Sequence, residues 1–190
     1  MRFASIVIAC GCVAVSACGQ SMKRQPADER AASANAAAAL HDAAIATPVE
    51  TRLPAAVTDK AKAIETMHAR HDAMKALGKS MNSLHRALAG NPADSNLIKV
   101  STSQMVIAAK KIPAMFPQGT GPDVGKTRAK ADIWKQPDVF LKKSSDFLAA
   151  AQAIDAAAQA DDSIKVMTLH ENVDKACKAC HDRFRAPGDR

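Results

Sequence analysis

The 190-residue chain is poor in aromatic side chains. It contains no tyrosine, one tryptophan and five phenylalanines, so aromatics make up 3% of its residues although 47% are hydrophobic. Strands favour β-branched and aromatic residues, whereas the alanine, leucine, methionine and lysine that dominate here enter helices at little entropic cost. The composition therefore excludes a β-sandwich or barrel, and it excludes tyrosine as a metal ligand or proton donor. Because aromatic side chains usually supply much of the buried surface of a small domain, we expect another large apolar body in the core.

The chain carries a formal net charge of +7. Basic proteins are steered towards acidic partners or anionic surfaces. Stripes that bind nucleic acid interleave basic and aromatic residues, and no such stripe occurs in this sequence. We therefore expect no binding to nucleic acid.

The first 17 residues have the pattern of a bacterial export signal. Arg2 gives a positive start, and the apolar run over residues 3–15 is too short to anchor stably in a bilayer. The run ends in Val-Ser-Ala-Cys, which resembles the lipoprotein signal, in which the cysteine is lipidated and becomes the new N-terminus. We predict a membrane anchor on Cys18 and a location in the periplasm. The alternative is an ordinary cleavage site that leaves a free thiol at Cys18.

Residues 18–57 are predicted to form a flexible tether. The segment is rich in alanine, contains Pro26, Pro48 and Pro54, and shows no sustained apolar stripe. An alanine-rich segment without large side chains has little surface to bury. The predicted organisation is thus a signal peptide over residues 1–17, a tether over 18–57 and a folded domain over 58–190.

Four amphipathic segments follow, in which apolar residues recur every three or four positions. They predict helices from Thr58 to Gly90, from Asp94 or Ser95 to Ile112, from Pro137 to Ala158, and from Asp161 or Asp162 to Phe184. The predicted inner face of the first helix is Ile64, Met67, His71, Met74, Gly78, Met81, His85 and Leu88. The predicted inner face of the second helix is Leu97, Val100, Met105, Ala108 and Ile112. That of the third is Phe140, Ser144, Phe147, Ala151, Ile154 and Ala158. That of the fourth is Ile164, Met167, His170, Val173, Cys177, Cys180, His181 and Phe184. With two short connections and one long loop, the pattern predicts an all-α, antiparallel four-helix bundle.

The fourth helix carries the sequence CKACH, a CxxCH motif, which is the signature of c-type haem attachment. On a helix, Cys177 and Cys180 share a face, so both sulfurs can reach the two vinyl groups on one edge of a porphyrin. His181 lies over the same face and can present an imidazole nitrogen to the iron. We therefore predict one covalently attached haem c per chain, with His181 as an iron ligand.

Three other uses of two cysteines at this spacing are disfavoured. A zinc site would need two further ligands close by, and no second cysteine pair is present in the mature chain. A thioredoxin-like motif would begin a helix in a βαβ unit, whereas this one ends an all-helical chain. A disulfide across three helical residues would be strained.

Two segments give the chain a specific family resemblance. The stretch CKACHDRFR over residues 177–185 resembles the C-terminal signature of class II cytochromes c, the cytochrome c′ family. The stretch RHDAMKALG over residues 70–78 is similar to the family's first helix, and Phe116-Pro117, Ile133-Trp134 and Phe140 resemble its central loop and the entry to its third helix. The resemblance covers residues 58–187 and implies a four-helix bundle with haem near the end of the fourth helix.

The resemblance implies roles for two residues at the iron, with His181 as the proximal ligand and Met74 on the distal side. Met74 either ligates the iron, which would raise the potential and suit electron transfer, or packs against a five-coordinate iron that can bind NO or CO. Ordinary core packing of Met74 and a bis-histidine site through His71 are the alternatives.

The same resemblance implies that Arg70 can pair with a haem propionate, the alternative being a solvated charge. Arg128 and Arg185 are weaker candidates for that role. The haem pocket is expected to be lined by Phe116, Trp134 and Phe184.

These observations predict a monohaem c-type cytochrome that carries single electrons between periplasmic partners, with iron held by His181 and with Met74 as the candidate second ligand. The alternative is a five-coordinate haem protein that binds NO or CO. We do not expect an enzyme, since His71 is the sole candidate for a distal acid–base group. The resemblance also suggests a homodimer.

Overall fold

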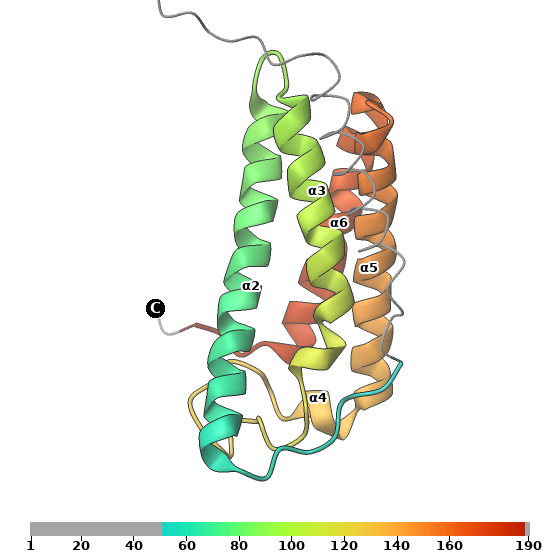
Figure 1. Ribbon diagram of the computed structural model, residues 1–190. Helices are drawn as coiled ribbons and strands as arrows, with labels where there is room; N and C mark the ends of the chain where they lie inside the picture. The colour runs from blue at the N-terminus through green and yellow to red at the C-terminus, as the bar shows by residue number, and fades with distance from the viewer. Residues whose placement is uncertain (1–50, 189–190) are drawn as a thin grey trace, which may run out of the picture. The chain divides into compact units, whose positions relative to one another are not determined.

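Four long helices form an antiparallel bundle in the computed structural model, which describes residues 51–188 (Figure 1). They are α2 (Lys60–Ala89), α3 (Ser95–Lys111), α5 (Pro137–Gln159) and α6 (Ser163–Phe184). The long connection between α3 and α5 contains the 3-10 helix η1 (Pro113–Met115) and the single-turn helix α4 (Asp132–Lys135). Within the described residues the extended pairing is limited to one isolated bridge between Ala129 and Arg185. The predicted all-α four-helix bundle is confirmed.

Several predictions made from the N-terminal sequence concern residues outside the described range. These are the signal peptide over 1–17, the lipid anchor on Cys18 and most of the tether over 18–57, and they stay predictions. Among residues 51–188, no helix combines the length and apolar character needed to cross a bilayer.

The last residues of the predicted tether contact the bundle. Leu53 packs against the core, and the N–H of Val57 donates a hydrogen bond of 2.8 Å to the carbonyl of Gln118 in the long connection. Gly119 permits this close approach, because its φ is +79° and a Cβ there would lie 2.2 Å from the carbonyl oxygen of Val57. Ordered packing therefore begins before residue 58, the predicted boundary of the domain.

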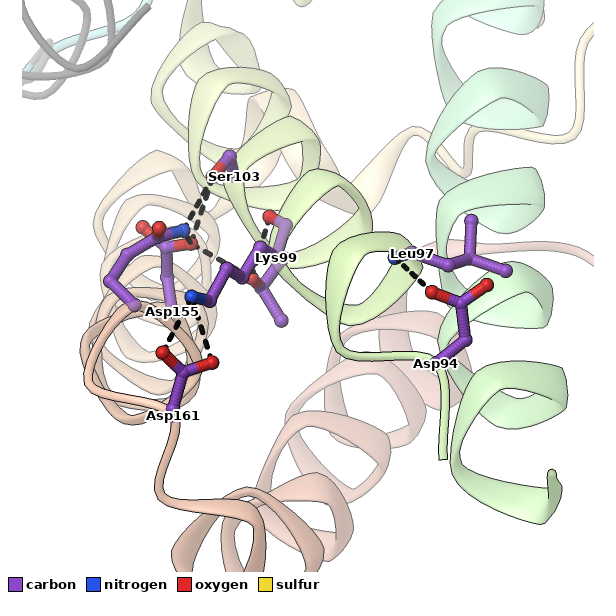
Figure 2. Close-up of polar contacts among 8 residues, drawn as sticks. Asp94, Leu97, Lys99, Ser103, Asp155 and Asp161 are labelled. Atoms are coloured by element: carbon purple, nitrogen blue, oxygen red, sulfur yellow. Dashed lines mark hydrogen bonds and ion pairs between the residues drawn. The ribbon is translucent and has the colours of Figure 1, made fainter. Parts of the chain in front are cut away.

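The long helices begin where the local sequence supplies a start signal. In α2, α3 and α6 an aspartate at the N-cap accepts a hydrogen bond from a backbone N–H three residues later, as Asp94 does from Leu97 in Figure 2. In α5, Pro137 occupies the first turn, where its missing N–H costs no hydrogen bond. The observed starts lie within two residues of the predicted ones.

The core follows the helices in a chain of contacts, with α2 against α3, α3 against α5 and α5 against α6. The predicted inner face of α5 is confirmed in full, because each of its members is buried: Phe140, Ser144, Phe147, Ala151, Ile154 and Ala158. By contrast, α2 and α6 make few direct contacts with each other. These two helices instead border a cavity, which is described below.

The predicted inner faces of the other helices are partly wrong. On α2 only Met67 of the predicted face is buried, and the buried positions are Ala63, Met67, Arg70, Ser80, Leu84 and Ala87. On α6, Ile164 and Met167 are 79% and 63% exposed, and on α3 Val100 is 53% exposed. Periodicity locates an apolar stripe on a helix but does not say which neighbour covers each part of it.

A buried carboxylate joins α3 to α5 (Figure 2). Asp155 is 2% exposed, and its Oδ1 accepts hydrogen bonds from Thr102 Oγ1 at 2.8 Å and Ser103 Oγ at 3.0 Å. The Nε2 of Gln159, one turn further along α5, donates to the same oxygen at 3.1 Å. A buried charge persists only when such donors surround it, so this network fixes how α3 and α5 align.

Replacing Asp155 with alanine is expected to destabilise the protein by about 2–3 kcal/mol, because buried hydroxyls on α3 lose a charged acceptor. Urea unfolding of the haem-loaded protein, followed by circular dichroism, measures the change. Asp146→Ala on the same helix is the control: its carboxylate is exposed and pairs with Lys142 at the surface, so it should cost less than about 1 kcal/mol. Equal losses in the two variants would contradict a structural role for the Asp155 network.

Candidate functional site

A cavity of about 380 Å³ is lined by α2, α5, α6 and the long connection. Its lining residues include residues within 67–78 of α2, within 140–147 near the start of α5 and in the last turns of α6. Figure 1 shows the start of α5 and the end of α6 at the end of the bundle where α4 lies. The surface of the cavity is mostly apolar and includes four of the five phenylalanines of the chain, which are Phe116, Phe140, Phe147 and Phe184. The structure brings to this one cavity the five residues that the sequence predicts at the site, which are Arg70, Met74, Cys177, Cys180 and His181.

The wall formed by α6 carries the CxxCH motif in its last two turns. Cys177 and Cys180 are half-buried free thiols that line the cavity, and His181 lies beside them. The helix continues to Phe184, which is 3% exposed and packs at the base of the cavity wall. Because the motif lies within a regular helix, both sulfurs and the imidazole reach the same cavity.

The environment of the two thiols keeps them protonated. Burial, together with the nearby charge of Asp174, raises the pKa of Cys177 to about 11. Burial also raises the pKa of Cys180, although the charge of Lys143 opposes that rise. Cysteines used in disulfide exchange have lowered pKa values, so these thiols do not have the character of a redox CxxC pair.

The imidazole of His181 is held in its neutral form. Desolvation by the surrounding protein lowers the pKa of His181, and the positive charges of Arg185 and Arg128 lower it further, against a smaller opposing effect of Asp182. Binding to a metal requires the neutral imidazole. The neutral form of His181 is thus the one that can serve as a metal ligand.

The wall formed by α2 combines half-buried apolar side chains with exposed polar ones. Met74 and Leu77 are half-buried in it, whereas His71 and Lys75 line it from exposed positions. Gly78 lies one turn after Met74, and a Cβ built there would meet no atom within 4 Å. The glycine therefore leaves room beside Met74 for a broad, flat group to approach the helix backbone.

Arg70 on α2 is tied to the long connection. Its Nη1 donates to Thr120 Oγ1 at 3.0 Å and to the carbonyl of Met115 at 3.4 Å. Its Nη2 donates to the carbonyl of Thr120 at 3.0 Å and to Thr127 Oγ1 at 3.1 Å. One guanidinium thus holds three points of the connection against α2.

Arg70 also stacks against two aromatic rings. Its Cζ lies 4.7 Å from the centre of the Phe116 ring and 5.8 Å from that of Trp134. The residue is 4% exposed, and burial lowers the pKa of Arg70 to about 10, so the guanidinium stays charged at neutral pH. It is therefore not the solvated charge considered as one alternative, and its donors are directed to protein groups. Its predicted pairing with a propionate stays a prediction.

Two other cations suit an anionic group at the cavity better than Arg70 does. Arg128 and Arg185, the weaker sequence candidates, line the cavity from exposed positions; Arg185 is one partner of the Ala129–Arg185 bridge and Arg128 precedes the other. Lys143 on α5 also lines it and was missed. The available signal was its spacing, since Lys143 lies three residues after Phe140 and four before Phe147 and so shares their face of the helix.

The predicted aromatic lining is correct for two of its three members. Phe116 and Phe184 line the cavity. Trp134 stands behind Phe116, with ring centres 6.3 Å apart, and its Nε1 donates to the carbonyls of Phe116 and Pro117 at 3.1 and 3.0 Å. The tryptophan shapes the connection and does not form part of the cavity surface.

The residues present fit a covalently attached haem. The donor set consists of two thiols and a neutral imidazole on one helix wall, which is what attachment and axial ligation require. The second requirement is an apolar enclosure for the porphyrin. The phenylalanine rings and the open space at Gly78 meet it. The exposed Arg128 and Arg185 border the cavity. They could pair with the carboxylates of haem where these reach the solvent.

Comparison with known proteins places this geometry in context. Residues 65–185 match the family model described as cytochrome C′. A cytochrome c′ of Rhodospirillum rubrum is 37% identical over 75 residues, which cover 40% of this chain and half the length of that relative. A cytochrome c′ of Allochromatium vinosum is 30% identical over 128 residues, which cover 65% of this chain and 79% of that relative. A cytochrome c-554 of Cereibacter sphaeroides is 29% identical over 131 residues, which cover 66% of this chain and 96% of that relative.

Solved structures give the same result at the level of the fold. A cytochrome c′ from Thermochromatium tepidum superimposes with a TM-score of 0.60 at 25% identity, covering 65% of this chain and 96% of that one. A cytochrome c prime from Shewanella frigidimarina gives a TM-score of 0.59 at 26% identity, covering 69% and 99%. Almost the whole length of these proteins thus corresponds to the bundle of this chain.

Proposed function

The chain belongs to the cytochrome c′ family and carries one covalently attached haem c, and from that premise we propose that it binds a small neutral gas such as NO or CO at the haem iron. When bound, haem supplies an iron that can take a gas ligand or an electron. The protein's own contribution is to hold that iron through His181 and to set the polarity of the cavity wall that an incoming ligand meets.

In this proposal the residues of α6 attach the group and orient it. Cys177 and Cys180 form the two thioether bonds, and His181 gives its neutral imidazole nitrogen to the iron. The raised pKa values of the thiols and the lowered pKa of the imidazole are consistent with these roles. The exposed guanidinium groups of Arg128 and Arg185 pair with propionates.

The observation that carries the proposal is the scarcity of buried hydrogen-bond donors on the α2 wall. Its half-buried side chains are Met74 and Leu77, the Nη donors of the buried Arg70 are directed to the long connection, and the ammonium of Lys75 is on an exposed residue. Bound O₂ and peroxide need a donor or an acid–base group beside the iron, whereas NO and CO do not. The one imidazole on this wall, that of His71, is exposed. Gas binding is therefore favoured over O₂ activation or peroxidase turnover.

A second candidate function is single-electron transfer with Met74 as the sixth iron ligand. It is favoured by the position of Met74, which combines a ligating sulfur with a half-buried place on the cavity wall. A thioether ligand would raise the reduction potential and close the iron to gases. The two candidates differ in one respect only, which is whether the Met74 sulfur bonds to iron or packs beside it.

Absorption spectra of the oxidised and reduced protein, recorded with and without CO, distinguish the two candidates. We expect a high-spin spectrum that shifts when CO is added. Met74→Ala should stay high-spin and take up CO roughly tenfold faster, which corresponds to about 1.4 kcal/mol less steric cost in the transition state. Met81→Ala is the matched control, because Met81 is on α2 but does not line the cavity. A low-spin protein that ignores CO until Met74 is removed would establish the electron-transfer alternative instead.

A further inference from the structure

A second cluster of ligating side chains lies between α2 and α6, away from the haem cavity. It consists of His85, one turn before the end of α2, and of His170 and Asp174, which are one turn apart on α6. The same three residues line a separate surface hollow together with Leu88, Ala89 and Met167. None of the three belongs to the lining of the haem cavity.

The ligand atoms of this cluster converge on one point. The Nε2 of His85 and the Nε2 of His170 each lie 3.7 Å from the same oxygen, Oδ2 of Asp174. One ligand atom from each of the three residues lies within 4.8 Å of the other two, and the centres of the two imidazole rings are 4.6 Å apart with the rings at 71°. Two rings and a carboxylate therefore surround a common space.

Hydrogen bonding among the three residues does not account for this arrangement. Separations of 3.7 Å exceed the length of a hydrogen bond. The Nε2 of His170 is closed to solvent and has no hydrogen-bond partner among the described residues. A buried nitrogen without a partner is unfavourable, so native structures seldom keep one without a further occupant such as a water or an ion.

We propose that His85, His170 and Asp174 form a binding site for a divalent transition-metal ion of the zinc and copper class. Imidazole nitrogen suits these ions, and two histidines with one carboxylate are a common three-residue set for them. Bonds of about 2.0–2.1 Å in a tetrahedral site place ligand atoms about 3.4 Å apart, which small side-chain rotations would reach from the present separations. Mg²⁺ and Ca²⁺ prefer oxygen ligands and would be rejected.

The site leaves one coordination position facing the solvent. His85 and Asp174 are about half exposed, with side-chain exposures of 43% and 49%, and the hollow that they line is open. A fourth ligand would therefore be water or a group from outside the cluster. Structural zinc sites are closed by four protein ligands, so this site is of the exchangeable kind, in which the ion can enter and leave the folded protein.

The position of the cluster gives the ion a mechanical effect on the bundle. Contacts between α2 and α6 are otherwise sparse, and an ion held by His85 from one helix and by His170 and Asp174 from the other would join them. Met74 lies 11 residues before His85, or about 16 Å along the helix axis. Bound metal would thus clamp the two helices that form opposite walls of the haem cavity.

Isothermal titration of the haem-loaded protein with Zn²⁺ tests the proposal. We expect one ion per chain at the cluster, tighter binding of Cu²⁺ in keeping with the usual order of affinities, and no binding of Mg²⁺. Removing a residue that only supports a metal ligand lowers metal affinity roughly 10–100-fold. His85→Ala, His170→Ala and Asp174→Asn each change a ligand itself, so each should lower Zn²⁺ affinity by at least that factor. Zn²⁺ at 100 times its dissociation constant should also raise Tm by roughly 5–10 °C.

Two comparisons keep the test specific. His68→Ala removes an exposed histidine of α2 that lies outside the cluster, and it should leave Zn²⁺ affinity unchanged. The haem absorption spectrum should not shift during the titration, which shows that the ion does not act at the iron. Absence of Zn²⁺ binding, or binding that survives all three cluster variants, would overturn the proposal. Because His85 is substantially exposed, His85→Ala should fold normally and remains informative if His170→Ala does not.

Discussion

Substituting both Cys177 and Cys180 with alanine is expected to abolish covalent haem attachment. The two thiols are the free cysteines that line the cavity, and no other cysteine lies within the described residues. Haem staining of a denaturing gel and the mass of the intact chain measure the loss. Lys178→Ala, which changes an exposed residue between the two cysteines, should keep full attachment.

The double cysteine variant should also lose thermal stability. The walls formed by α2 and α6 make few direct contacts, so the group enclosed between them contributes much of what holds them together. We expect a lower Tm and a less cooperative transition in circular dichroism. A variant that lacks covalent haem yet melts like the parent would show that the bundle is stable without its cofactor, and the low aromatic content of the core would then need another explanation.

The second large effect is expected from Arg70→Met, which should destabilise the protein by about 2–5 kcal/mol. The substitution keeps the apolar stem but leaves the carbonyl groups of Thr120 and Met115 and the hydroxyl of Thr127 without their donor. Because Thr127 and the residues after it form part of the cavity wall, the haem spectrum should change as well. Urea unfolding and absorption spectroscopy measure the two effects.

Two further variants show whether geometry or charge explains the role of Arg70. Arg70→Lys keeps the positive charge, but a single ammonium cannot reach all the acceptors that the planar guanidinium binds. It should therefore be only slightly more stable than Arg70→Met. Arg86→Met changes an arginine on the exposed side of the same helix and should cost less than about 1 kcal/mol. Full rescue by lysine, or equal losses at positions 70 and 86, would contradict the anchoring role.

The long helices could be predicted closely because their signals are local. Aspartate caps, Pro137 in a first turn and the Gly90-Asn91-Pro92 break act through neighbouring residues, and the observed ends follow them. The short elements η1 and α4 were not predicted, since three or four residues are too few to show a helical period. The inner face of α5 was correct because α3 and α6 both pack against this helix, and at the cavity end Phe140 packs against Phe116 and Phe184.

The predictions for α2 and α6 were less complete because parts of these helices face a cavity and not another helix. Periodicity correctly placed Met74 and His71 on one stripe but could not show that Met74 is half-buried and His71 exposed. It also placed Ile164 on the inner face, although that residue is largely exposed in the first turn of α6. Which parts of a stripe are covered depends on neighbours far away in the chain.

The sequence alone determined the helical class and the positions of the four helices, and it predicted haem attachment and ligation by Cys177, Cys180 and His181, because each depends on residues only a few positions apart. Tertiary structure decided the partners of Arg70, which lie 45 to 57 residues away, and the exposed cations that border the cavity. It likewise decided the meeting of His85 with His170 and Asp174. Such contacts depend on how whole helices pack, and local spacing carries no information about that.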